Sequence, residues 1–210
     1  PPSIPFQPDK PFIAAGSAHE FYVTWRTPGG QQGCARTVNG GLFTADWKVT
    51  LPIMDGTTIV IGHFAIHPAV WRDGSFYAAY RLGSNIRFLK GTDDNSGGSG
   101  NNGVIFTHLA NPSPSGPTPI EVPIDGSLYS GGLPGRLPGV EDGNYTPQLA
   151  VDPTNANRLY VAYHNPGTVA GLPDANNIDA YVRTIDKRGQ SCGSPVGLVE
   201  ARSSSVDGQK

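Results

Sequence analysis

The sequence predicts an all-β fold, and three observations support this prediction. Residues that form turns are frequent, with 28 Gly and 20 Pro in a chain of 210 residues. Charged residues make up only 15% of the chain, whereas soluble domains usually contain about 25%. No long segment has apolar residues at helical spacing, while short apolar runs bounded by turn residues recur along the whole chain.

The apolar runs belong to an internal repeat of three units. Each unit begins with a short apolar run beside a Pro, continues through a turn, and returns in a strand rich in aromatic residues; these segments are 11–26, 67–81 and 146–164. One position of the repeat is always Tyr, and a second position three residues later is always aromatic: Tyr22, Tyr77 and Tyr160, followed by Trp25, Tyr80 and Tyr163. Such a repeat indicates that one structural unit is built three times.

Two further strands are predicted in each unit. The third strands cover 34–41, 86–98 and 178–189 with their turns, and the fourth cover 47–51, 104–109 and 196–201. In the third strands Arg36, Lys90 and Arg183 align, as do Asn39, Asp93 and Asp186. Four antiparallel strands make up one blade of a β-propeller, so the chain is predicted to form about three blades.

The predicted blades span residues 9–56, 62–125 and 144–207 of one propeller-type domain. Residues 111–144 are too rich in Pro and Gly for a blade interior, and we expect an irregular insertion there, with a smaller one at 166–177. Closed propellers have about 4 to 8 blades, so three blades form an incomplete propeller. We expect the remaining blades to come from a longer chain, or the propeller to close by pairing with a second copy.

The turn after the third strand of the first unit carries a family resemblance. Thr37-Val38-Asn39-Gly40-Gly41-Leu42-Phe43 resembles the Asp box of sialidase-like propellers, also called the BNR repeat. The segment 184–189 resembles the same box with one extra residue, and the second unit is more degenerate. In this box the Asn or Asp side chain caps the turn and the Gly takes a positive φ, which is a structural role.

The predicted ligand-binding residues lie on one rim. Arg26, Arg81 and His164 each follow the second strand of a unit, and Lys10, His67 and Tyr145 begin the first strands on the same rim. Basic side chains in this arrangement suit a carboxylate or sulfate on a glycan. The alternative is that these are ordinary polar residues in solvated loops.

Other chemistry receives less support from the sequence. The acidic pairs Glu141-Asp142 and Asp93-Asp94 lie in Gly-rich loops, where solvated turn residues are expected, and no cofactor is predicted. Calcium at 93–95 remains an alternative, although the spacing of a calcium loop is absent. His63 and His67 would lie about 13 Å apart on an extended strand, too far to share a zinc ion.

Composition restricts the partners and the compartment. The net charge of -2 argues against nucleic-acid binding, and no apolar run has the length of about 18 residues that a membrane span requires. Cys34 and Cys192 fall in the first and third units, which disfavours a disulfide because bridged Cα atoms lie within about 7 Å. The resemblance implies a secreted, extracellular protein.

The resemblance leaves three functions open. The first is a module that binds a glycan or an extracellular protein on its rim. The second is a carbohydrate-active enzyme, a sialidase-like hydrolase or a polysaccharide lyase, whose site further blades would complete. Sialidases use an arginine triad, a Tyr paired with a Glu, and an Asp, and their Arg-Ile-Pro signature is not matched by Ser3-Ile4-Pro5. The third is a structural part of an extracellular assembly.

Overall fold

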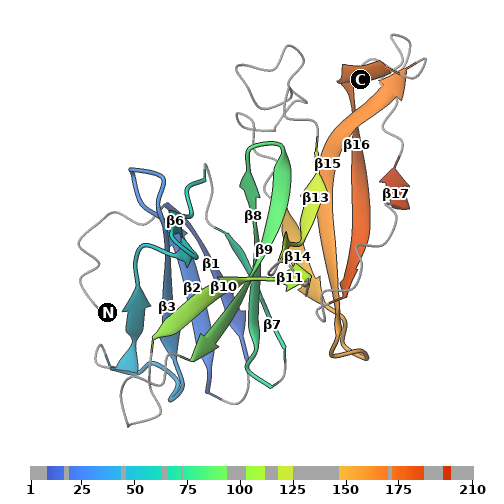
Figure 1. The fold of residues 1–210 in the computed structure, drawn as a ribbon. Coiled ribbons are helices and arrows are strands. Elements are labelled where there is room, and N and C mark those ends of the chain that lie inside the picture. Colours follow the sequence, from blue (N-terminus) through green and yellow to red (C-terminus); the bar gives the residue numbers. More distant parts are fainter. Residues whose placement is uncertain are drawn as a thin grey trace, which may run out of the picture.

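The strands form three antiparallel sheets that follow one another along the chain and lie side by side (Figure 1). The computed structural model describes residues 9–16, 19–43, 46–62, 66–71, 73–93, 103–111, 118–124, 147–169, 172–186 and 196–199. Within these ranges every regular element is a β-strand. The predicted all-β fold is confirmed.

The first sheet contains four strands in chain order. They are β1 (Asp9–Ala15), β2 (Phe21–Arg26), β3 (Gln32–Thr37) and β4 (Lys48–Thr50). A small hairpin, β5 (Met54–Asp55) and β6 (Thr58–Ile59), follows this sheet. The hairpin stays attached because the amide of Ile53 donates to Gln32 O at 2.8 Å, and that of Gln32 donates to Val60 O at 3.2 Å.

The second sheet has the same four-stranded order and one additional strand. Its strands are β7 (His67–Val70), β8 (Phe76–Leu82), β9 (Asn85–Asp93) and β10 (Val104–His108). β13 (Glu121–Pro123) pairs with the first residues of β9, and the short strands β11 (Ala110–Asn111) and β12 (Thr118–Pro119) pair with each other. The region predicted as an irregular insertion at 111–144 therefore contributes β12 and β13, while residues 125–144 lie outside the described ranges.

The third sheet again follows chain order. It contains β14 (Gln148–Val151), β15 (Arg158–Val169), β16 (Leu172–Asp186) and β17 (Val196–Val199). β15 and β16 remain paired as far as Val169 and Leu172, so the strands extend into the segment predicted as an irregular insertion at 166–177. The irregularity there is a register shift on β16, because Pro166 pairs with Ile178 whereas Gly167 pairs with Asp174.

The hydrophobic core lies in two layers, one on each side of the second sheet. Successive side chains of a strand point to opposite faces, so β8 serves both layers. Phe76, Ala78 and Tyr80 pack toward the first sheet, whereas Tyr77 and Ala79 pack toward the third sheet. This double-sided burial explains why the sequence of β8 reads as a continuous apolar run.

The register extends the repeat into three dimensions. Tyr22 lies in the layer between the first and second sheets, and Tyr77 lies in the layer between the second and third. Tyr160 alternates with Leu159 and Val161, which face the second sheet, so it lies on the opposite face of the third sheet. The repeat Tyr of the first and second sheets therefore faces the following sheet, and Tyr160 lies on the corresponding face of the third sheet.

The predicted alignment of the third strand of the third unit, which includes Arg183 and Asp186, is wrong by a single residue. Tyr22 pairs with Arg36 and Tyr77 pairs with Lys90, but Tyr160 pairs with Thr184. Thr184 therefore holds the position that the sequence assigned to Arg183, which pairs with Val161. One residue along a strand reverses the face on which a side chain lies, and the sequence of the third strand gave no signal to fix its register.

The turn at 37–43, which resembles an Asp box, has the predicted backbone but a different side-chain arrangement. Gly40 and Gly41 have φ values of 85° and 66°, as expected for this turn. The Asn39 side chain accepts a hydrogen bond from Thr37 Oγ1 at 2.8 Å and donates one to Asp46 Oδ1 at 2.7 Å. Asn39 thus connects the turn to the segment before β4, and its role is structural.

Candidate functional site

A group of polar side chains meets at the junction of the first and second sheets. We name it the polar cluster; its members are Asp55 of β5, Tyr80 of β8, Arg87 of β9, His108 of β10 and Glu121 of β13. The sheet register accounts for its assembly, because Arg87 pairs with Tyr80 on one side and with Glu121 on the other. Side chains at paired positions share a face and lie close together.

Asp55 is the buried centre of the cluster, with only 1% of its side chain exposed. The hydroxyl of Tyr80 donates a hydrogen bond to Asp55 Oδ2, and Nδ1 of His108 lies 2.9 Å from Asp55 Oδ1. Nη1 of Arg87 lies 3.7 Å from Asp55 Oδ2. Three polar groups thus surround one carboxylate, which satisfies a charge that would otherwise be costly to bury.

The Tyr80 hydroxyl remains protonated in this setting. Burial raises the pKa of Tyr80 well above its usual range, and the hydrogen bond to Asp55 and the charge of Asp55 raise that pKa further. Arg87 opposes the shift without cancelling it. Tyr80 is therefore a fixed hydrogen-bond donor that holds Asp55, and its hydroxyl is poorly suited to act as a nucleophile.

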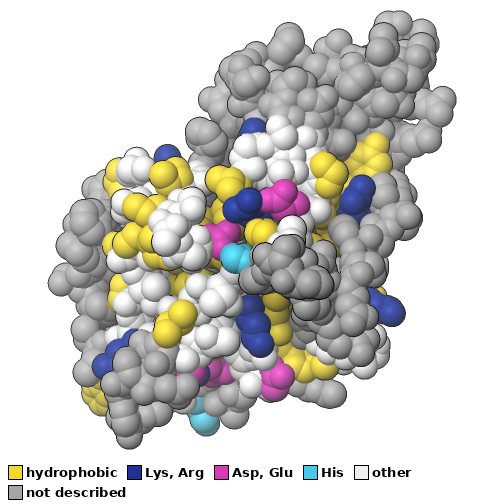
Figure 2. All heavy atoms as spheres, viewed as in Figure 1, with side chains coloured by type: hydrophobic (Ala, Val, Ile, Leu, Met, Phe, Trp, Pro, Cys, Tyr) yellow, Lys and Arg dark blue, Asp and Glu magenta, His cyan; other side chains and the backbone are white. Residues whose placement is uncertain are grey.

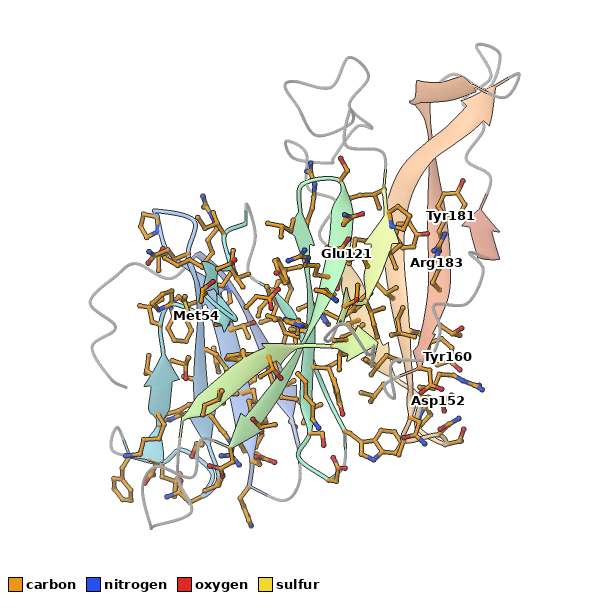
Figure 3. The ribbon with its side chains drawn as sticks, viewed as in Figure 1. Met54, Glu121, Asp152, Tyr160, Tyr181 and Arg183 are labelled. Atoms are coloured by element: carbon orange, nitrogen blue, oxygen red, sulfur yellow. The ribbon has the colours of Figure 1, made fainter. Side chains whose placement is uncertain are left out.

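The outer part of the cluster reaches solvent. The exposed fractions of the Arg87, His108 and Glu121 side chains are 26%, 30% and 30%. Glu121 Oε1 accepts a hydrogen bond from Arg87 Nε at 2.6 Å, and its Oε2 accepts one from Asn85 Nδ2 at 2.9 Å. Figure 2 shows acidic, basic and His side chains gathered at the centre of this face, and Figure 3 places Glu121 there beside the second sheet.

This arrangement presents both donors and acceptors in fixed positions. The ion pair with Asp55 limits the rotamers of Arg87, the hydrogen bond with Asp55 limits those of His108, and Asn85 limits those of Glu121. Groups that are held in place before binding suit a polar ligand, because less conformational entropy is lost on association. Among the described residues, no three His, Cys, Asp or Glu side chains form a group that could hold a metal ion.

Two of the predicted rim residues bond to nearby backbone carbonyls. Nε of Arg26 donates to Gly62 O at 2.8 Å, and Nε of Arg81 donates to Gly83 O at 2.8 Å. The pairing of Asp9 with Arg26 places Lys10 at the same end of the first sheet as Arg26. These residues lie at strand ends, as predicted, and a role in ligand binding stays a prediction.

The other predicted rim residues are less accessible or lie outside the description. The ring of His67 lies 5.0 Å from that of Phe12. Burial lowers the pKa of His67, partly offset by a hydrogen bond to the backbone of Leu149, so this side chain favours the neutral form. His164 belongs to β15 and pairs with Ala180, but its side chain is not among those described. Tyr145, His63, Cys192 and the pair Glu141-Asp142 lie outside the described residues.

A second charged network crosses the same junction at the Asp-box end. Glu20 Oε1 accepts hydrogen bonds from Tyr22 OH at 2.9 Å and from Arg36 at 2.8 and 2.9 Å. Nη1 of Arg36 donates to Asp93 Oδ2 of the second sheet at 2.9 Å. The Asp93 carboxylate considered for calcium is thus bonded to an arginine, and its neighbours Asp94 and Asn95 lie outside the described residues.

The sequence did not reveal the members of the polar cluster. Asp55 precedes Gly56 and resembles a turn residue, while Glu121 lies in a segment that was interpreted as an irregular insertion. His108 ends a strand without any motif. Side chains alternate between the two faces of a strand, so the sequence of β8 could have predicted the face on which Tyr80 lies. The partners of Tyr80 could not be predicted in this way, because they come from distant segments.

No model of a known protein family matches the chain, and neither a curated protein nor a solved structure matches it. In the part of the chain that the structure describes, no helix has the length and apolar character needed to cross a bilayer.

Proposed function

We propose that the chain is a secreted binding module of the propeller type that recognises a glycan through the polar cluster. The observation that carries this proposal is the buried Asp55, which orients two partly exposed side chains, Arg87 and His108. Glycans present many hydroxyl groups and often carboxylates, which need donors and acceptors in fixed positions. The cluster supplies an arginine, an imidazole and a carboxylate within one small area.

The three sheets support the propeller part of the proposal. Each contains four antiparallel strands in chain order, which is the composition of a blade. The repeat Tyr of the first and second sheets faces the next sheet, so successive sheets are related by one repeated packing rule. We interpret the sheets as consecutive blades, and the Asp-box resemblance suggests an extracellular location.

Substitution of His108 tests the proposed binding site. We expect the wild-type chain to bind one or more members of a panel of neutral, sialylated and sulfated oligosaccharides in titration calorimetry. His108→Asn should weaken that binding at least about tenfold, equivalent to ~1.4 kcal/mol, because it removes the imidazole that contacts Asp55. The matched control is His19→Asn, since His19 is exposed and Asn tolerates its φ of 66°.

Two results would contradict the binding proposal. One is the absence of binding to every oligosaccharide in the panel by a folded wild-type chain. The other is equal weakening by His108→Asn and His19→Asn, which would place the binding site away from the cluster. Circular dichroism and the unfolding midpoint of both variants show that the comparison is made between folded proteins.

A glycoside hydrolase is the second candidate function. Asp55 and Glu121 both contact Arg87, so two carboxylates share one small site, as the enzymes of this chemistry require. The raised pKa of the buried Tyr80 opposes a tyrosine nucleophile, and we therefore favour binding over catalysis. Release of a reducing sugar from any oligosaccharide of the panel, abolished by Glu121→Gln, would reverse this preference.

A further inference from the structure

The outer face of the first sheet carries a continuous apolar row across all four strands. The register places Ile13 beside Val23, Val23 beside Ala35, and Ala35 beside Val49. The row lies on the face opposite Tyr22 and Cys34, which pack against the second sheet. Its two ends are exposed, with Ile13 at 69% and Val49 at 49%, whereas Val23 is half-buried and Ala35 is buried.

The apolar positions of the equivalent row are buried in both other sheets, although the row also contains His108 in the second sheet and Arg183 in the third. Val23 follows the repeat Tyr22, and the residues that follow Tyr77 and Tyr160 are Ala78 and Val161, each 0% exposed. Their register partners Leu89 and Leu149 are 0% and 4% exposed. In each case a preceding sheet covers the row with the face that carries its own repeat Tyr. The first sheet has the same type of face, and the described residues contain no sheet that packs on it.

The third sheet offers the complementary face. Tyr160 and Ala162 lie opposite the face that packs on the second sheet, and both are partly exposed. This is the face that carries the repeat Tyr, the kind that covers the apolar row at both internal junctions. One chain therefore presents both an apolar row, on the first sheet, and a face with a repeat Tyr, on the third sheet. In a pair of chains, the Tyr face of each copy can cover the apolar row of the other.

We propose that the outer face of the first sheet is an interaction surface for a second copy of this chain. The Tyr160 face of the third sheet of one copy packs on the Ile13–Val23–Ala35–Val49 row of the other. Because each copy contributes both faces, two such contacts are formed and the pair closes without a free apolar row. Large apolar side chains that stay exposed, as Ile13 and Val49 do, are typical of protein–protein interfaces.

Native mass tests this proposal over a range of protein concentrations. Size-exclusion chromatography with light scattering should give twice the chain mass of 22.1 kDa for the wild type. Val49→Asp should raise the dissociation constant of the dimer at least about tenfold, because a charge would be buried in the apolar row. The matched control is Ile105→Asp, since Ile105 is 51% exposed and lies on β10 of the second sheet, outside the row.

A third variant distinguishes this pairing from a symmetric contact between two first sheets. Ala162→Asp should dissociate the dimer as Val49→Asp does, because it alters the other face of the same contact. A wild-type mass of 22.1 kDa at every concentration would overturn the proposal. So would a dimer that survives Val49→Asp, or one that Ala162→Asp leaves intact while Val49→Asp breaks it. The unfolding midpoint of each variant confirms that the subunit is folded.

Discussion

The junction between the first and second sheets differs in chemistry from that between the second and third. The first junction has an aromatic centre, where the ring of Phe76 lies 4.9 Å from that of Tyr22 and 5.4 Å from that of Phe106. Charged networks lie beside this centre, one around Glu20 and Arg36 and one around Asp55. The second junction is built largely from aliphatic side chains, including Val122, Leu159, Val161 and Ile185.

The difference shows how one repeated unit can serve two purposes. An aliphatic layer holds two sheets together through buried apolar area, an interaction that has no preferred direction. Each charged group in a buried network needs an ion-pair or hydrogen-bond partner at a defined position. The networks therefore mainly fix how the two sheets lie relative to each other. The proposed binding site lies at the charged junction, where the position of each polar group is determined from both sides.

The largest expected effect comes from removing a central ring at each junction. Phe76 and Phe88 both belong to the second sheet, both are 0% exposed, and they face opposite layers. Phe76→Ala and Phe88→Ala should each lower the free energy of unfolding by about 3–5 kcal/mol, because each leaves a cavity. Denaturant titration measures both. A loss below about 1 kcal/mol for either variant would show that its junction is not tightly packed.

A smaller effect should follow from breaking the charged network. The Glu20 side chain is 5% exposed and the Arg36 side chain 11%, so Glu20→Ala leaves a largely buried arginine with Asp93 as its remaining carboxylate. We expect a loss of about 3 kcal/mol in denaturant titration, at the low end of the range for broken buried ion pairs. Glu20→Gln keeps a hydrogen-bond acceptor and should lose less. Equal losses would show that the carboxylate charge, which both variants remove, carries the whole contribution.

The sequence predicted the strands well because their signal is local. All twelve strands of the three repeated units are present, and each overlaps the segment predicted for it. Apolar runs bounded by turn residues are sufficient to identify such strands. Where pairing depended on register, as for Arg183 and Thr184, the prediction failed because no local feature fixes it.

The polar cluster was not predictable for a different reason. Its five members come from five strands, and only Tyr80 lies at a repeat position. Asp55 and Glu121 belong to segments that interrupt the repeat, so a comparison of equivalent positions in the three units does not identify them. The departures from the repeat, β5 and β13, are the elements that bring the two carboxylates to Arg87.

The repeat tyrosines of the first and third sheets allow a finer comparison. Tyr22 bonds to Glu20 at the charged junction, whereas Tyr160 donates to Asp152 Oδ2 at 2.8 Å within a turn (Figure 3). Oδ1 of Asp152 accepts hydrogen bonds from Thr154 Oγ1 at 2.8 Å and from the amides of Thr154 and Asn155 at 2.8 and 3.0 Å. These bonds, with the one from Tyr160, lower the pKa of Asp152 well below its usual range.

This lowered pKa predicts a pH effect confined to the turn. Because the folded-state pKa lies below the unfolded value, the stabilisation is complete above the ordinary aspartate pKa of about 3.9 and is lost as the pH falls below it. Thermal unfolding from about pH 6 to about pH 3 should therefore show a steeper loss of stability for the wild type than for Asp152→Asn. Parallel pH profiles of the wild type and Asp152→Asn would show that the charge of the Asp152 carboxylate does not stabilise the turn. The same pH profile is measured for Glu20→Gln, which alters the junction of the first and second sheets. Only Asp152→Asn should lose the part of the pH dependence that comes from the Asp152 carboxylate.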